Sequence, residues 1–239
     1  MTELFVMALP KPPRPEYSTT IPSSGKKIKY QPFTVKEEKV LILAAESEDM
    51  DEISNAIANV LTNCITTPGV DVYELALFDI EYLFLRARSK SIGEKLQLRV
   101  TDHEDGTQVE TELNVDTVKV KKTDGHTDLI ELSEDLTIKM RYPDLNFFAE
   151  GVKIDNITDS TETVARCISQ IVVGEEVYSR EEMTVEEVVE WLDGLTTEQF
   201  GKIMQFFNTM PKLSHTIKLK NPNTGKTFET VLEGLADFF

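Results

Sequence analysis

The amino-acid sequence predicts an α+β fold, with an N-terminal helical domain, a central antiparallel β-rich region, and a C-terminal helical hairpin followed by a β-hairpin. Apolar residues recur at helical spacing through residues 34–93 and 158–211, but alternate with polar residues through 94–157 and 212–239. An extended arm and a short strand are expected before them, in residues 1–33. We expect the last β-hairpin and the tail after it to pack on the β-rich domain.

Proline defines the N-terminal arm, because it lacks an amide donor and fixes its own backbone torsion. The prolines of the arm are Pro10, Pro12, Pro13 and Pro15. A short strand is predicted over Lys27–Tyr30, after a turn at Ser23–Gly25. Thr34 and Glu37 have the spacing of a capping box, so a helix begins there. Its predicted apolar face consists of Val40, Leu41, Leu43, Ala44 and Ala45.

Two more helices are predicted in the N-terminal domain. Asp49 and Glu52 cap the first, whose apolar stripe consists of Ile53, Ala56, Ile57, Val60, Leu61 and Cys64. The second is predicted to begin at Asp71 and is almost entirely apolar through Leu75–Leu85, as expected of a buried central helix. Its end is cationic, and pairing with the helix dipole is the expected role of Arg86, Arg88 and Lys90.

The β-rich region begins with a hairpin. Leu96, Leu98 and Val100 alternate with polar residues on one side of an Asp-Gly turn at 103–106, and Val109, Thr111 and Leu113 do so on the other. Short strands are predicted around 118–120, 129–132 and 136–140. A second hairpin is predicted near the C-terminus, with strands at 215–220 and 226–231 around the turn Asn221–Gly225.

Three helices are predicted between these β segments. Asp159 and Glu162 precede apolar residues at helical spacing, so a helix is expected through Val164, Cys167, Ile168 and Ile171. Capping boxes at Thr184 and Thr196 begin two further helices, which the short turn at 193–195 makes antiparallel.

The net charge of −17 is distributed unevenly, with +3 on residues 1–40, −21 on 41–210 and +1 on 211–239. Such an acidic body repels phosphate backbones, so we do not expect nucleic-acid binding by the whole protein. No apolar run approaches the roughly 20 residues of a membrane-spanning helix, and a basic secretory start is lacking. We therefore expect a cytoplasmic protein without a membrane partner, whose Cys64 and Cys167 are reduced and buried.

No residue qualifies from the sequence as catalytic, cofactor-binding or metal-binding. His103, His126 and His215 lie in or near predicted turns, without Cys or His at metal-ligand spacing. Gly225–Thr227 matches the end of a phosphate-binding loop, but Lys220 stands where the leading glycine belongs and a strand follows. The sequence thus favours a non-enzymatic protein without a cofactor.

Two segments, Ile21–Val40 and Leu77–Glu94, together with the ending Leu232–Phe239, resemble the baseplate hub proteins and hub assembly factors of T-even-type tailed phages. The resemblance implies a non-enzymatic assembly protein that binds other tail or hub proteins in the host cytoplasm. The alternative that it leaves open is a structural hub subunit retained in the tail baseplate of the virion.

The same family often carries Cys-x-x-Cys pairs in two hairpin turns, which implies a zinc ribbon built from distant segments. Here the turns read His103–Gly106 and Asn221–Gly225, so thiolate ligands are absent and we expect no zinc. The two hairpins are still expected to lie side by side. A degenerate zinc-ribbon module that binds nucleic acid is the weaker alternative.

The non-acidic ends of the chain are the predicted partner-binding surfaces. At the N-terminal end these are Lys26, Lys27 and Lys29, which precede the first capped helix. At the C-terminal end, Phe238 and Phe239 could anchor a partner, because exposed terminal aromatic residues are unusual. Burial of the two phenylalanines against their own domain is the alternative.

Overall fold

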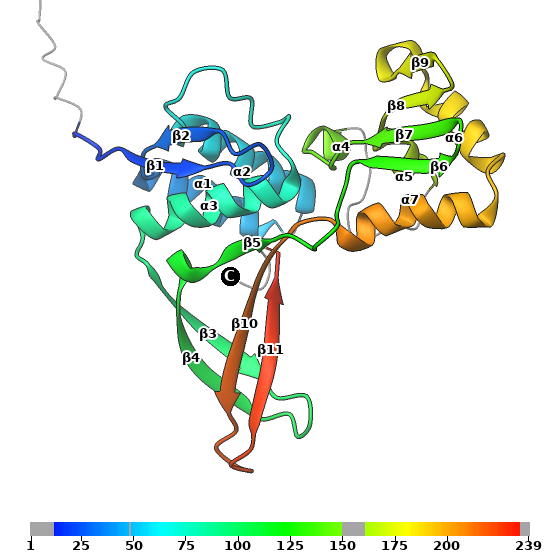
Figure 1. Ribbon diagram of the computed structural model, residues 1–239. Helices are drawn as coiled ribbons and strands as arrows, with labels where there is room; N and C mark the ends of the chain where they lie inside the picture. Colours follow the sequence, from blue (N-terminus) through cyan, green and yellow to red (C-terminus); the bar gives the residue numbers. More distant parts are fainter. Residues whose placement is uncertain (1–11, 48, 150–160, 235–239) are drawn as a thin grey trace, which may run out of the picture.

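The computed structural model describes residues 12–47, 49–149 and 161–234, and its mixed α+β fold confirms the predicted fold class (Figure 1). The helices are α1 (Val35–Glu46), α2 (Met50–Cys64), α3 (Leu77–Ser91), α4 (Asn146–Ala149), α5 (Thr161–Arg166), α6 (Val185–Asp193) and α7 (Thr197–Thr209), with short 3-10 helices η1 (Val115–Thr117) and η3 (Arg180–Glu182). The strands are β1 (Tyr17–Thr20), β2 (Lys27–Tyr30), β3 (Lys95–Thr101), β4 (Gln108–Asn114), β5 (Lys119–Lys121), β6 (Leu129–Ser133), β7 (Leu136–Met140), β8 (Ile168–Val173), β9 (Glu176–Ser179), β10 (Lys212–Lys220) and β11 (Thr227–Glu233).

The strands form small antiparallel sheets. β1 pairs with β2 and β3 pairs with β4, while larger sheets have the orders β11-β10-β5 and β6-β7-β8-β9. The hairpins β3–β4 and β10–β11 project side by side away from the helices (Figure 1). Within the described parts of the chain, none of the helices has the length and apolar character needed to cross a membrane.

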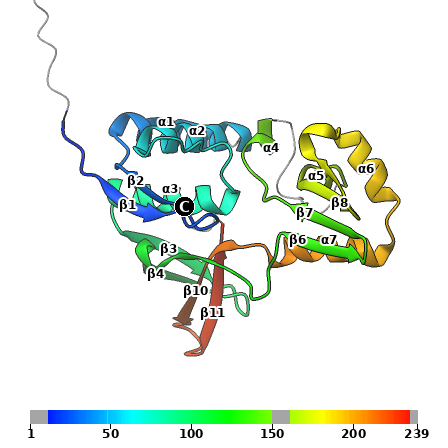
Figure 2. The same ribbon diagram turned by 45° about the horizontal axis from the view of Figure 1, so that its top comes forward.

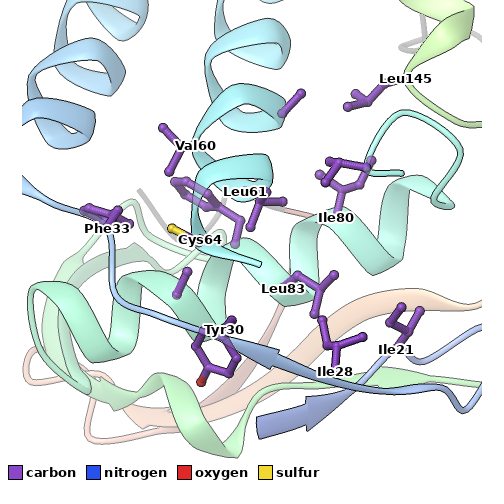
Figure 3. Close-up of a cluster of buried hydrophobic side chains, with 14 residues drawn as sticks. Ile21, Ile28, Tyr30, Phe33, Val60, Leu61, Cys64, Ile80, Leu83 and Leu145 are labelled. Atoms are coloured by element: carbon purple, nitrogen blue, oxygen red, sulfur yellow. The ribbon is translucent and has the colours of Figure 1, made fainter. Parts of the chain in front are cut away.

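The first hydrophobic core lies between α2, α3 and the β1–β2 hairpin (Figure 3). Ile28 and Tyr30 point into it from one face of β2, and the predicted stripe of α2 supplies Val60, Leu61 and Cys64. This burial confirms the alternation predicted for 27–30 and the helical spacing predicted for α2. The predicted capping box at the start of α1 is also present.

α3 begins at Leu77, so the predicted start at Asp71 is wrong. The side chain of Asp71 accepts a hydrogen bond from the amide of Tyr73, which forms a local turn in place of a helix. The amide of Leu77 then donates to the carbonyl of Pro143 at 3.0 Å, which ties the start of α3 to the segment after β7. The prediction of a largely buried helix is confirmed from this point on.

Arg86 of α3 does not act mainly through the helix dipole, as the sequence suggested. Its guanidinium is buried and donates to the carbonyls of Val115 and Val118, at 2.7 and 2.6 Å, and to Asp116 at 2.9 Å. These bonds fix η1 against α3. A third core forms beside them from Leu85, Leu96, Leu113, Val115, Val118, Leu213 and Leu232.

The helix predicted through Ile168 and Ile171 is wrong. α5 ends at Arg166, and β8 follows it as the partner of β7. The register shifts next to Ser169, so that Met140 opposes Ile168 while Ile138 opposes Ile171. This β-bulge places two residues three positions apart on the same face of the sheet, which imitates helical spacing.

The second core fills the space between the β6–β9 sheet and helices α5, α6 and α7. Its most buried members include Ile138, Val164, Cys167, Ile203 and Phe206. The predicted capping boxes of α6 and α7 are both present. The boundaries proposed for the domains remain a prediction.

Candidate interaction surfaces

The basic ribbon, defined as Lys26, Lys27 and Lys29, lies on the β1–β2 hairpin. Pleating turns Ile28 and Tyr30 into the first core, so Lys27 and Lys29 point to solvent on the opposite face. Lys26 stands at the end of the turn before them and is also exposed. The three predicted lysines are therefore all exposed on the β1–β2 hairpin, with Lys27 and Lys29 in β2 and Lys26 just before it.

The three lysines differ in how they are engaged. Lys29 Nζ lies 2.8 Å from Glu16 Oε2, and this hydrogen bond raises the pKa of Lys29 and lowers that of Glu16. Lys26 Nζ donates to the carbonyl of Gly69 at 3.0 Å. The Lys27 ammonium group makes no hydrogen bond or ion pair with any residue that the structure describes, so its charge is the most available to a partner.

A buried carboxylate holds the basic ribbon in place. The amide of Ser23 donates to Asp79 Oδ1 at 2.9 Å, and the Ser23 hydroxyl donates to Oδ2. Asp79 is fully buried in α3, and this burial raises its pKa, although the bonds from Ser23 oppose the rise. Asp79 is not among the residues predicted from the sequence, although an acidic residue inside an almost wholly apolar run is a usable signal.

The two projecting hairpins meet at their turns. Asn221 Nδ2 donates to Asp102 Oδ2 at 2.7 Å and lies 3.0 Å from both carboxylate oxygens of Asp105. Asn223 Nδ2 donates to Thr107 Oγ1 at 3.0 Å. Amide and carboxylate groups thus join the turns at the position where the family resemblance implies thiolates.

The two turns also share one backbone geometry. In the first, the amide of Gly106 donates to the carbonyl of Asp102, and in the second the amide of Gly225 donates to the carbonyl of Asn221. Both glycines have positive φ, at 75° and 72°. The turn before β2 repeats this pattern with Gly25 and Ile21.

His126, Cys64 and Cys167 occupy structural positions. His126 lies between Thr209 Oγ1 and Tyr142 Oη, each at 2.9 Å, and burial lowers its pKa. Cys64 and Cys167 are buried free thiols, and burial raises the pKa of each to about 12. Across the described ranges, no group of three or more His, Cys, Asp or Glu side chains is arranged to hold a metal ion.

A polar pocket reaches the turn that precedes the basic ribbon. It is lined by Ser23, Glu74, Ala76, Arg141, Tyr142, Asp144 and Asn146. Arg141, its cation, already pairs with Asp144 at 2.9 Å and donates to the carbonyl of Arg166 at 2.9 Å. The hydroxyl of Ser23 in this lining is also engaged, since it donates to the buried carboxylate of Asp79.

The C-terminal prediction is not tested by the structure, because Phe238 and Phe239 lie outside the described residues. The role of the three lysines as a partner surface also stays a prediction, although their placement is now known.

The fold defines a mixed α+β protein whose two projecting hairpins are joined at their turns by side-chain hydrogen bonds. Residues 14–239 match the family model described as T4 bacteriophage base plate protein, so the chain belongs to that family. It is also 25% identical over 230 residues to the baseplate hub assembly protein gp26 of Enterobacteria phage T4, covering 94% of this chain and 98% of gp26. No solved structure matches the chain. The chain is therefore a phage baseplate-related protein, as the sequence analysis indicated.

Proposed function

We propose that this protein acts in building the central hub of a contractile phage tail baseplate, by binding other tail or hub proteins while the hub forms. The observation that carries the proposal is the similarity to gp26, which extends over 94% of this chain and 98% of that hub assembly protein. Assembly of this kind needs complementary surfaces and no chemical step. The proposed place of action is the host cytoplasm.

The basic ribbon is the proposed contact surface for a tail or hub protein. Lys27 is exposed and unengaged among the described residues, on a hairpin that the Ser23–Asp79 contact anchors to α3. A cation presented on a fixed strand favours a partner surface that carries carboxylates. An exposed cluster of lysines is also unusual on a protein with a net charge of −17. Lys26 and Lys29 complete the surface while also binding their own chain.

Purification of the tagged full-length protein from infected cells, followed by quantitative mass spectrometry, tests the proposal. Enrichment of tail or hub proteins is expected, whereas enrichment of replication or metabolic enzymes in their place would overturn it. Mass spectrometry of purified particles addresses the alternative. Stoichiometric copies in the particle would support a structural hub subunit, and their absence would support an assembly factor.

A charge reversal locates the contact. Lys27→Glu is the informative variant, because reversal of Lys26 or Lys29 would also break a contact within the chain. Lys139→Glu is the matched control, since Lys139 is an exposed lysine in a strand of a different sheet. We expect Lys27→Glu to lose most of the co-purified hub protein and Lys139→Glu to retain it. Equal retention by both variants would remove the basic ribbon from the proposal.

The nucleic-acid alternative has a direct test of its own. Binding of DNA by the isolated protein, with an affinity that falls steeply as salt is added, would support a degenerate zinc-ribbon module. The −21 charge of residues 41–210 opposes such binding. We expect no salt-dependent binding at physiological ionic strength.

A further inference from the structure

α1 exposes large apolar side chains to solvent. The exposed fractions of Val35, Val40, Ile42 and Leu43 are 67%, 42%, 52% and 66%. Only Ala44 of this helix is buried, and α1 supplies none of the buried side chains of the first core (Figure 3). Figure 2 shows α1 beside α2 at the upper margin of the molecule, with no other labelled helix or strand over its outer side.

Helical geometry gathers these side chains on one face. Successive residues turn by about 100°, so Val35, Lys39, Ile42 and Glu46 form one row and Lys36, Val40 and Leu43 form the adjacent row. The opposite side carries Glu37, Glu38, Leu41 and Ala44, which are buried or half-buried. We call the two exposed rows the outer face of α1, and a contiguous apolar surface with a polar rim is typical of a protein contact.

The charges on this outer face are ordered along the helix. Lys36 and Lys39 lie in its N-terminal half, whereas Glu46 lies in the last turn, which contains no basic residue. Exposed Asp49 and Asp51 follow close behind. The outer face is therefore positive towards the N-terminal end of α1 and negative towards its C-terminal end, which is the arrangement that an antiparallel copy of the same face complements.

We infer that the outer face of α1 binds the outer face of α1 in a second copy of this chain, with the two helices antiparallel. A two-fold axis between Ile42 and Leu43 sets Ile42 opposite Leu43 of the second copy. The same axis sets Lys39 opposite Glu46 of the second copy, and this pair occurs twice. Two helix dipoles then oppose each other as well.

The size of the surface sets the strength of the contact. A helix of this length extends about 18 Å, so its outer face is well below the roughly 800 Å² per partner of a standard stable interface. The net charge of −17 on each copy also opposes association. The dimer is therefore weak and depends on protein concentration. The inference goes beyond the proposed function and does not rest on it.

Sedimentation equilibrium of the full chain measures this dimer directly. At about 0.15 M salt the Debye length is about 8 Å, so the acidic bodies are screened from each other while contact pairs persist. We expect a monomer–dimer equilibrium, and Leu43→Gln should weaken it about tenfold or more because an apolar contact is lost twice. Leu129→Gln is the control, since Leu129 is 54% exposed in β6 and should leave the equilibrium unchanged.

A charge swap tests the register. Lys39→Glu and Glu46→Lys each place like charges opposite each other twice, and each should weaken dimerisation, whereas the double variant should restore it. Lys39→Glu places a negative charge in the N-terminal half of α1, and Glu46→Lys places a positive charge in its last turn. Both signs are favourable for the helix dipole, so neither substitution should destabilise the helix itself.

Three results would overturn the inference. They are a protein that stays monomeric up to about 1 mM, a dimer insensitive to Leu43→Gln, and a double variant that fails to restore association. A monomer whose α1 amides resist hydrogen exchange would instead assign the outer face to another part of the same chain.

Discussion

Asn221 Nδ2 and Asp102 Oδ2 are 2.7 Å apart, although 119 residues separate them in the sequence. Asn221 is fully buried and Asp102 nearly so, which removes both groups from water. The Asp102 carboxylate also accepts from the amide of Glu104 at 3.0 Å. This contact joins the turns of the two projecting hairpins.

Asn221→Ala is expected to lower the free energy of unfolding by about 1–3 kcal/mol, because the buried carboxylate of Asp102 loses a donor. Urea unfolding followed by circular dichroism measures the change. Asn223→Ala is the matched control, since Asn223 joins the same turns through a bond to Thr107 in an exposed position. Its loss should cost less than about 1 kcal/mol, and equal costs for the two variants would contradict this reading.

Asp79 should make stability depend on pH. Burial raises its pKa above the ordinary value of 3.8, so the folded protein binds this proton more tightly than the unfolded chain does. The stability that protonation contributes is complete below pH 3.8 and is lost as the pH rises through the folded-state pKa. The side chain of Asp79→Asn does not titrate, so we expect the free energy of unfolding of this variant to fall less over that pH range than that of the wild-type protein. Urea unfolding at a series of pH values measures the difference.

Ser23→Ala is the control for the Asp79 prediction. It removes the Ser23 hydroxyl that opposes the pKa rise, while Asp79 still titrates. The pH-dependent loss of stability should therefore persist or increase in this variant. If the free energy of unfolding of Asp79→Asn changed with pH as steeply as that of the wild-type protein, Asp79 would not be the cause of the pH dependence.

Local signals in the sequence predicted much of this fold. The capping boxes at Thr34, Thr184 and Thr196 mark true helix starts, because each box satisfies backbone amides within four residues of its own position. The hairpins around Gly106 and Gly225 were also predictable from local sequence, because each turn needs a residue with positive φ and glycine adopts that conformation readily.

Features that depend on distant partners were not predictable. The β-bulge beside Ser169 exists only because β8 pairs with β7. It gives the apolar residues of this strand the spacing that is typical of a helix. Residues 40–45 of α1 are all apolar, so periodicity could not tell its inner Leu41 from its outer Leu43. The basic ribbon was found from its local sequence, but its anchor at Asp79 required the fold.

Cys64 and Cys167 should be unreactive in the folded protein. Burial raises the pKa of each thiol to about 12, so almost no thiolate is present at pH 8, and the sulfur atoms are covered. We expect negligible reaction with Ellman's reagent in native buffer and reaction of both thiols in denaturing urea. Rapid labelling of the native protein would show that a core opens on the timescale of the assay.

Arg86 and Arg99 form ion pairs of equal length whose loss should have unequal costs. Arg86 lies 2.9 Å from Asp116 and Arg99 lies 2.9 Å from Glu110, but the guanidinium of Arg86 is buried while that of Arg99 is exposed. Arg86→Leu leaves the carbonyls of Val115 and Val118 without this donor, so we expect a loss of about 3–5 kcal/mol. Arg99→Leu should cost less than about 1 kcal/mol, because an exposed pair contributes little.

Urea unfolding of both arginine variants separates burial from charge as the source of stability. Arg86→Lys adds a third comparison, since it keeps the charge but cannot supply the planar fork that reaches both carbonyls and Asp116. It should therefore recover only a small part of the loss. Full recovery by lysine would mean that charge alone holds η1 against α3, and similar losses for Arg86→Leu and Arg99→Leu would contradict the structural role of the buried guanidinium.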